Sequence, residues 1–415
     1  MTSPTFAALG LAEPLLNALV AQTFTTPTPI QAASIPGLLE GRDLLGIAQT
    51  GTGKTAAFAL PLLQHLMGGN IRPAPFAPRA LVLAPTRELA LQIEDTFRKL
   101  GAQTRLRTAI VIGGASRFKQ VEAMRRGADI VIGTPGRICD LMNTRELRLE
   151  SAHRFVLDEA DRMLDLGFIK DIRKFVGALP VQRQSSLFSA TMPPEVAKLA
   201  AGLLQNPMRV EIARVEATTP KIVQSVHFVP QAAKRALLAD MLGDPDFSRV
   251  IVFTRTKRGA NRVAEDLEAA GHRVNALHGN KSQAQREKAL DQFKSGRARV
   301  LVATDIAARG IDVNGISHVI NYDLPAEPES YVHRIGRTAR AGAAGIAISF
   351  CDNTEVSTLR AIERQIGNAI PVAGGSPPPA GSQGRQPQRP SSPGQAARRR
   401  RPQGNNAAGR VNRAA

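Results

Sequence analysis

Short apolar runs that end in turn residues alternate with longer stretches of helical period along the first half of the chain. The apolar runs lie at residues 43–48, 79–84, 107–112, 129–133, 154–158 and 185–190. Buried strands that alternate with helices are typical of a mostly parallel sheet covered on both faces. The pattern therefore predicts an α/β domain.

The alternation pauses at the polar segment ARVEATTPK, residues 213–221, and then resumes with apolar runs at 250–254, 273–278, 299–304, 318–321 and 345–350. A chain of 415 residues is long enough for two domains that each bury a core. We expect an N-terminal region at 1–33, a first α/β domain at 34–212, a linker at 213–221, a second α/β domain at 222–370 and a tail at 371–415.

The net charge of +19 indicates a polyanionic partner. The tail contains eight arginines and no Asp, Glu or Lys, among many Pro, Gly, Gln and Ser residues. Such a composition cannot bury a core and predicts disorder. Because removing these eight charges still leaves +11 on the rest of the chain, we favour a nucleic-acid tether over a purely solubilising tail.

Membrane insertion and secretion are not expected. No apolar run approaches the length that spans a bilayer, and the first residues, MTSPTFAALG, lack a charged region followed by a long apolar one. Cys139 and Cys351 lie far apart and form no CxxC pair, which favours two unpaired thiols in a reducing compartment. We therefore predict a soluble, cytoplasmic protein.

A glycine-rich loop, AQTGTGKT, follows the first predicted strand. Its backbone N–H groups can surround phosphates, while the lysine reaches the outer phosphates and the threonine hydroxyl is left for Mg²⁺. Ala48 stands where the general pattern has its first glycine, and Pro61 should kink the following helix. The predicted nucleotide-binding residues of this loop are Ala48, Gln49, Thr50, Gly51, Thr52, Gly53, Lys54 and Thr55.

Three carboxylates, Asp158, Glu159 and Asp161, lie within four positions at the end of the strand at 154–158, in the stretch HRFVLDEADRMLD. Carboxylates so close together repel unless a cation lies among them. Alone, the stretch DEAD is equally compatible with an exposed acidic turn. Together with Lys54 and Thr55 it predicts a hydrolysis site, in which Asp158 serves the Mg²⁺ and Glu159 is the general base that activates water.

The second domain has no GK[ST] after its strand at 250–254, so we expect no nucleotide site of its own there. It does carry HRIGRTAR, with Arg334, Arg337 and Arg340 three residues apart. On a helix this spacing would place three guanidinium groups near one face, either as a solvated basic face or as phosphate ligands. We favour Arg337 and Arg340 as arginine fingers on the γ-phosphate.

Other loops at predicted strand ends combine small residues with exposed amides and arginine, as expected for phosphate contacts. They are PTREL at 85–89, Gly113 with Gly114, and TPGR at 134–137; ordinary turn chemistry is the alternative. With no Trp and two Tyr in the chain, a base-stacking platform is not expected, so binding should be indifferent to sequence. The predicted contact residues are Pro85, Thr86, Arg87, Gly114, Thr134, Pro135, Gly136 and Arg137.

Taken together, these motifs resemble those of the DEAD-box RNA helicases over about Phe6 to Phe350. PTPIQ, AQTGTGKT, PTREL, GG, TPGR, DEAD, SAT, VFTRT, HGNKSQAQR, ATDIAARGID and HRIGRTAR occur in that family's order. The N-terminal stretch and the short core with a basic tail look most like the bacterial RhlE-type subgroup. The resemblance implies two RecA-like domains that bind ATP between them and RNA across them.

The resemblance also implies roles for individual residues. Phe24 would stack on adenine and Gln31 would read its edge, with Gly310 and Asp312 also on the nucleotide side. On the RNA side would be Thr304, Gln283 and Arg286; Ser282 and Gln285 fit a capping box that begins the helix carrying the last two. Ser189 and Thr191 would couple hydrolysis to unwinding through Asp158 or Asp161 and His333. Thr23 and Ala339 stand where the family usually has glycine.

The resulting hypothesis is an ATP-dependent RNA helicase that uses ATP and Mg²⁺ to separate short duplexes or remodel RNA–protein complexes. Single-stranded RNA and short duplexes are the expected partners, and ribosomal precursors or RNA-decay proteins are candidates. Two rivals remain open: an RNA clamp or scaffold without useful hydrolysis, and a DNA helicase or translocase, because composition does not separate ribose from deoxyribose.

Overall fold

The computed structural model describes residues 5–49, 51–68, 71–212, 222–308, 313, 315–339 and 344–377. The compact part of the chain ends at Pro377. The predicted linker at 213–221, nearly all of the predicted tail, Thr50, Gly310, Asp312 and Arg340 lie outside the described residues. What the sequence predicts for them is not tested by the fold.

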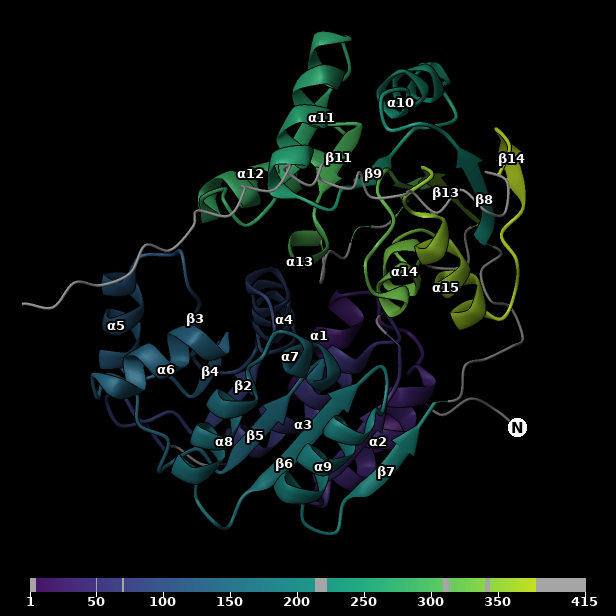
Figure 1. The fold of residues 1–415 in the computed structure, drawn as a ribbon. Coiled ribbons are helices and arrows are strands. Elements are labelled where there is room, and N and C mark those ends of the chain that lie inside the picture. Colours follow the sequence, from purple (N-terminus) through teal and green to yellow (C-terminus); the bar gives the residue numbers. More distant parts are fainter. Residues whose placement is uncertain are drawn as a thin grey trace, which may run out of the picture. The chain divides into compact units, whose positions relative to one another are not determined.

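Seven parallel strands form the first sheet, in the order β3-β4-β2-β5-β6-β1-β7 (Figure 1). Six of them match the apolar runs of the sequence to within a residue or two. The strands are β1 Leu44–Ile47, β2 Ala80–Leu83, β3 Thr108–Val111, β4 Ile130–Gly133, β5 Arg154–Leu157, β6 Gln184–Ser189 and β7 Met208–Glu211.

Helices cover both faces of this sheet and bury a separate apolar core on each. One face is covered by α1 Glu13–Ala21, α2 Pro29–Leu39, α3 Lys54–Met67 and α4 Arg87–Leu100, with the short η1 Ala7–Leu9 beside them. The other is covered by α5 Arg117–Arg125, α6 Pro135–Asn143, α7 Ala160–Asp165, α8 Ile169–Ala178 and α9 Pro194–Leu203. Helix α3 continues through Pro61 to Met67.

The second sheet repeats this topology strand for strand, in the order β10-β11-β9-β12-β13-β8-β14. Its parallel strands are β8 Ile222–Phe228, β9 Val250–Phe253, β10 Val274–Leu277, β11 Val300–Ala303, β12 His318–Asn321, β13 Gly345–Cys351 and β14 Val372–Gly374. Helices α10 Lys234–Gly243 and α11 Lys257–Ala269 cover one face, and α12 Gln283–Lys294, α13 Asp305–Ala308, α14 Pro328–Ile335 and α15 Val356–Ile366 the other. The predicted fold class, two tandem RecA-like parallel-sheet domains, is therefore confirmed.

Three strands carry no signal that the sequence prediction used. β7, β8 and β14 are partly exposed along their length, whereas β1, β2 and β4 are buried throughout. A continuous apolar run marks only a strand that is buried on both faces. β14 pairs with β8, so the ordered fold extends past the predicted start of the tail at 371.

Within the described part of the chain, no helix has both the length and the apolar character that crossing a bilayer requires.

Candidate functional site

The glycine-rich loop connects β1 to α3 and places Lys54 at the first position of the helix. Gly51 and Gly53 both have left-handed backbones, with φ of 84° and 93°. A Cβ on Gly53 would also lie 2.5 Å from Gln31 Nε2. Only glycine therefore fits this part of the loop, which leaves backbone amides free to turn toward a phosphate.

Lys54 is 5% exposed, and among the described residues its Nζ has no hydrogen-bond partner. A buried ammonium without a partner is costly, so this one is suited to a ligand that supplies acceptor oxygens. The phosphates of a nucleotide fit that requirement at the start of a helix.

Lys234 holds the corresponding position in the second sheet, because it begins the helix that follows β8, the topological equivalent of β1. It is fully buried, and its Nζ donates to Glu355 Oε2 at 2.6 Å and to the Tyr322 carbonyl at 3.0 Å. Arg255 also pairs with Glu355. Protein groups thus satisfy the second lysine, whereas the described part of the chain offers the first no such partner.

This comparison corrects one prediction. The apolar pattern predicts that the first strand of the second domain lies at 250–254, whereas the structure has β8 before it. β8 was missed because IVQSVHF mixes polar with apolar residues. Its helix carries Lys234, a residue to which the sequence prediction gave no role.

Asp158 lies directly after β5, and its side chain is buried. Burial is the largest cause that raises its pKa to about 6, the Lys54 ammonium opposes the shift, and the Glu159 carboxylate adds to it. One carboxylate oxygen accepts from the Glu159 backbone N–H at 2.9 Å. Burial thus disfavours the charged form of Asp158, as expected of a carboxylate whose compensating metal ion arrives with the nucleotide.

Glu159 has a left-handed backbone with φ of 54° and precedes the first residue of α7. A non-glycine residue in this conformation costs about 1–2 kcal/mol. Strain of this kind is found at functional sites, where the backbone must aim one side chain. Asp158 and Glu159 are thus presented on a sharp turn after the strand, as the motif predicts.

The raised pKa of Asp158 gives a test on the protein without metal or nucleotide. Its native pKa of about 6 lies above the ordinary value of 3.8, so the native state binds this proton more tightly than the unfolded state. Wild type should therefore gain unfolding free energy relative to Asp158→Asn as pH falls from about 6 toward 4, by roughly 3 kcal/mol at most. Urea unfolding of both proteins across this range measures the difference.

Val181→Ala, at an exposed residue without a titratable group, is the matched control, and its difference from wild type should not change with pH. A constant difference for Asp158→Asn as well would contradict the raised pKa.

Asp161 joins the end of β5 to the end of β6. Its Oδ2 accepts from Thr191 Oγ1 at 2.8 Å and from the Thr191 and Ala190 backbone N–H groups at 2.9 and 3.2 Å. Its own N–H donates to Ser189 Oγ at 3.2 Å. The predicted coupling residues Asp161, Ser189 and Thr191 are therefore in direct contact, although their role in coupling stays a prediction.

Gln31 is buried and connects α2 to the glycine-rich loop. Its Oε1 accepts from the Thr28 N–H at 2.9 Å in a capping box, and its Nε2 donates to the Gly53 carbonyl at 3.1 Å. Reading the edge of adenine would require the Gln31 amide to exchange one of these partners, so that role stays a prediction. Phe24 is 39% exposed, and Thr23 before it has a φ of 59°.

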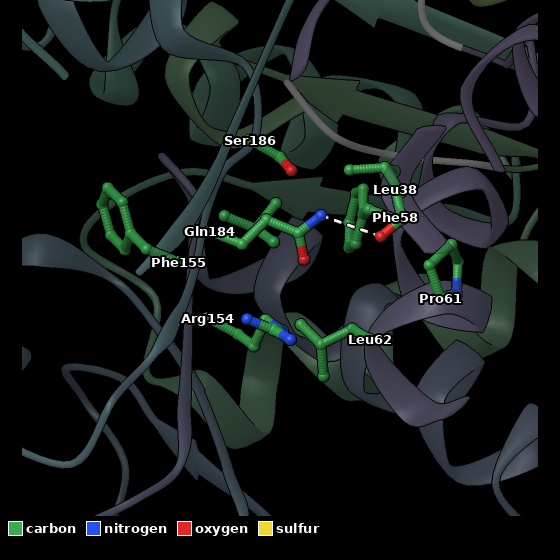
Figure 2. Close-up of a pocket in the computed structure, with 9 residues that line it drawn as sticks. Leu38, Phe58, Pro61, Leu62, Arg154, Phe155, Gln184 and Ser186 are labelled. Atoms are coloured by element: carbon green, nitrogen blue, oxygen red, sulfur yellow. Dashed lines mark hydrogen bonds between the residues drawn. The ribbon is translucent and has the colours of Figure 1, made fainter. Parts of the chain in front are cut away.

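A small cavity of about 10 Å³ lies behind α3, with room for a single water molecule (Figure 2). Gln184 crosses it and donates to the Leu38 carbonyl at 2.8 Å, as the dashed line in Figure 2 shows. It also donates to the Arg42 carbonyl at 2.8 Å. None of the predicted nucleotide-binding residues lines the cavity, whose contacts attach α2 to the sheet.

The three predicted phosphate loops are brought together beyond the ends of β2, β3 and β4. The Arg87 guanidinium lies over Gly113 and Gly114, where an added Cβ would approach it to 3.0 and 2.3 Å. Arg137 Nη1 contacts the Ala115 carbonyl and Gln120 Oε1, at 3.4 and 3.3 Å. A side chain at either glycine would displace the flexible end of Arg87, and Gly114 also has a left-handed backbone with φ of 77°.

Arg87 is in a positive environment. Burial lowers the pKa of its guanidinium, and the neighbouring Arg286 and Arg137 guanidinium groups lower it further. Concentrated positive charge of this kind favours a polyanion. Of the other predicted contacts, Thr86 caps α4, Thr134 immediately precedes α6, Pro135 and Gly136 open α6, and Pro85 is buried after β2.

The predicted capping box of Ser282 and Gln285 is confirmed at the start of α12. Gln283 and Arg286 are both buried. Arg286 Nη2 lies 2.7 Å from Glu88 Oε1, a close charge contact that is not aligned as a hydrogen bond. In this structure Arg286 therefore has a protein partner, and an RNA role for it, for Gln283 and for Thr304 after β11 stays a prediction.

The prediction of a three-arginine helix face is wrong, because α14 ends at Ile335 and Arg337 lies beyond it. Arg334 is buried and bonds Asp305 through Nε and Nη2, at 2.5 and 2.7 Å. It therefore stabilises the domain and is not available to a phosphate. Arg337 is held differently: its Nε donates to the His333 carbonyl at 3.1 Å.

No group of three or more His, Cys, Asp or Glu side chains is placed to hold a metal among the described residues. Mg²⁺ in nucleotide sites is usually held by one or two protein oxygens together with phosphates and water. Asp158 and Thr55 are of that kind and fit a Mg²⁺ ion that arrives with the nucleotide.

Comparison with known proteins shows the family of this chain. Residues 28–199 match the family model of the DEAD/DEAH box helicases, and residues 233–342 match that of the helicase conserved C-terminal domain. The chain is 44% identical over 360 residues to the DEAD-box ATP-dependent RNA helicase CshA of Geobacillus kaustophilus, covering 87% of this chain and 76% of that protein. It is 46% identical over 371 residues to the ATP-dependent RNA helicase DeaD of Buchnera aphidicola, covering 89% and 61%.

Among solved structures, Dbp5 of S. cerevisiae bound to RNA and ADP BeF3 is similar with a TM-score of 0.79 and 35% identity. That match covers 89% of this chain and 95% of the other. A DEAD box protein of Methanococcus jannaschii has a TM-score of 0.50 and 40% identity, covering 89% and 98%.

Proposed function

We propose a mechanism for this chain from one premise, that it belongs to the DEAD-box ATP-dependent RNA helicases. The observation that carries the proposal is the difference between the two lysines: Lys54 Nζ is buried without a hydrogen-bond partner among the described residues, whereas Lys234 is satisfied by Glu355 and Tyr322. One nucleotide site is therefore proposed, and it lies in the first domain.

In this site the loop from Ala48 to Thr55 would hold the phosphates, with Lys54 as their cation. Asp158 and Thr55 would serve Mg²⁺, which supplies charge neutralisation at the phosphates. Glu159 would take the proton of the attacking water, and Arg337 would stabilise the charge that develops on the phosphate. Asp161, which accepts a hydrogen bond from Thr191, would couple ATP hydrolysis at this site to RNA unwinding.

RNA would bind to the loops beyond β2, β3 and β4, through backbone amides and the arginines of the 85–89 and 134–137 segments. Phosphate contacts of this kind position a strand without reading its sequence. The proposed result is local separation of short duplexes and remodelling of RNA–protein complexes, with single strands and short duplexes as the substrates.

Stimulation of ATP hydrolysis by single-stranded RNA and by single-stranded DNA of equal length tests the proposal. RNA should accelerate hydrolysis strongly and DNA weakly. Equal stimulation by both would favour the DNA helicase or translocase. Binding of both ATP and RNA without accelerated hydrolysis would favour the RNA clamp.

The basic tail gives a further prediction. Removing residues 378–415 deletes eight arginines but leaves β14 in its sheet. RNA affinity should fall, and the slope of log affinity against log salt should flatten by about 0.7 for each phosphate that the tail neutralises on a single strand. Affinity titrations at several salt concentrations measure both, and an unchanged slope would make the tail a solubiliser.

We also propose the finer assignments that rest on the sequence. The RhlE-type subgroup is supported by the N-terminal pattern and the short core with its basic tail. A cytoplasmic location is supported by two cysteines without a disulfide and by the bacterial relatives. Ribosomal precursors or RNA-decay proteins are proposed as the class of partner.

A further inference from the structure

The first turn of α5 presents an aromatic ring to solvent. Phe118 is 78% exposed, and among the described residues the other exposed phenylalanine is Phe24 at 39%. A single exposed apolar side chain is ordinary on a protein surface and needs no explanation by itself. The position of Phe118 next to the Gly113–Gly114 loop indicates RNA as its partner.

Arg117 and Lys119, the neighbours of Phe118 in sequence, are both exposed, and Arg117 is paired with Glu146. Helix α5 begins three residues after Gly114, where the Arg87 guanidinium lies over the glycine pair. Gln120, in the same turn, donates to the Ile112 carbonyl at 2.9 Å and so fixes α5 to this loop. The helical turn that carries Phe118 is therefore attached to the loop at which we place the RNA backbone.

We propose that Phe118 stacks on one nucleobase of the bound single strand. The inference rests on the proposed RNA contact at Gly113 and Gly114 and extends it from phosphates to a base. The phosphate of that nucleotide would lie against the loop and its cations, and its base would cover the ring. Aromatic side chains bind bases in this way without reading them, because every base has a π-face.

Stacking at this position would also distinguish strands from duplexes. A base in a duplex has its faces covered by its neighbours, whereas an unpaired base offers one to Phe118. The contact would therefore favour the separated strand. It amends the expectation from composition, which predicted no base-stacking platform and could not show that one phenylalanine lies exposed in the helix after this loop.

The chain has no tryptophan, so Phe118→Trp introduces a unique indole fluorophore. Titration with an adenine-rich single-stranded RNA should quench its emission as the RNA binds. The same backbone with abasic sites along its length should still bind, as followed by anisotropy of a labelled RNA, but should not quench. Quenching of equal size by the abasic strand would overturn base stacking.

Val181→Trp is the matched control. Val181 is 79% exposed, and it precedes β6, so it lies at the amino end of that parallel strand, whereas the Gly113–Gly114 loop follows the carboxyl end of β3. Its indole should be indifferent to RNA. If this variant binds RNA and the Phe118→Trp emission does not change, the inference fails while the proposed function stands; if neither variant binds RNA, the proposed function fails.

Phe118→Ala separates stacking from charge. Loss of one stacked base should weaken single-stranded RNA affinity by about 5- to 150-fold. The slope of log affinity against log salt should stay as in wild type, because no phosphate contact is removed. An affinity of Phe118→Ala for single-stranded RNA equal to that of wild type would overturn the proposal.

Discussion

Glu159→Gln is expected to leave ATP and RNA bound while turnover falls by about 10³-fold, within the range that a general base contributes. Glutamine keeps the size and polarity of the side chain but cannot accept the proton of the attacking water. The substitution leaves untouched the backbone N–H that Glu159 donates to Asp158 Oδ1. Steady-state ATP hydrolysis in saturating RNA, together with separate nucleotide and RNA binding titrations, measures the result.

Glu195→Gln, an exposed glutamate in the first turn of α9, is the control and should hydrolyse ATP as wild type does. Normal steady-state hydrolysis by Glu159→Gln would remove Glu159 from the base role. Loss of nucleotide binding instead would mean that the carboxylate holds the ligand and does not act on water.

The sequence predicted the central strands well because they are buried on both faces. β1, β2, β4 and β9 consist of continuously buried residues, and each appears in the sequence as an apolar run. β8 has seven residues of which one, Val226, is fully buried. Its place in the sheet is set by pairing with β13 and β14, which are distant in sequence, so local pattern could not reveal it.

Site residues could be proposed from the sequence where they lie close together in one motif. Asp158 and Glu159 follow β5 directly, and Lys54 begins α3 after the glycine-rich loop that follows β1. Contacts between distant segments were not predictable: Lys234 and Glu355 are 121 residues apart and meet only in the folded domain. The pairing of Arg334 with Asp305 is another contact between distant segments. The spacing of the three arginines therefore could not show that Arg334 is unavailable to a phosphate.

The backbone is left-handed at both positions where this chain lacks the family's usual glycine. Thr23 and Ala339 have φ of 59° and 55°, the left-handed region in which glycine is unstrained. Each residue therefore adopts a backbone conformation that glycine would adopt without strain. Because neither position carries a charged group, we expect activity to survive both departures.

Arg337→Ala is expected to reduce RNA-stimulated ATP turnover by about 10³-fold, by analogy with other arginine fingers. The proposed role of the Arg337 guanidinium is to stabilise the charge that develops on the phosphate in the transition state. Because that charge is absent before the reaction, nucleotide affinity should change far less than turnover. Arg337→Lys should recover little, because an ammonium lacks the planar, bidentate donor geometry. Single-turnover hydrolysis with ATP and RNA in place measures the chemical step.

The choice of control decides what this experiment means. Arg334→Ala is unsuitable, since it leaves Asp305 without its buried partner and should destabilise the domain by about 3–5 kcal/mol. Arg297, an exposed residue between α12 and β11, offers a matched substitution to alanine that should leave turnover unchanged. A turnover close to wild type in Arg337→Ala, with Arg297→Ala equally active, would exclude the finger and move the source of transition-state charge stabilisation back to Lys54 and the glycine-rich loop.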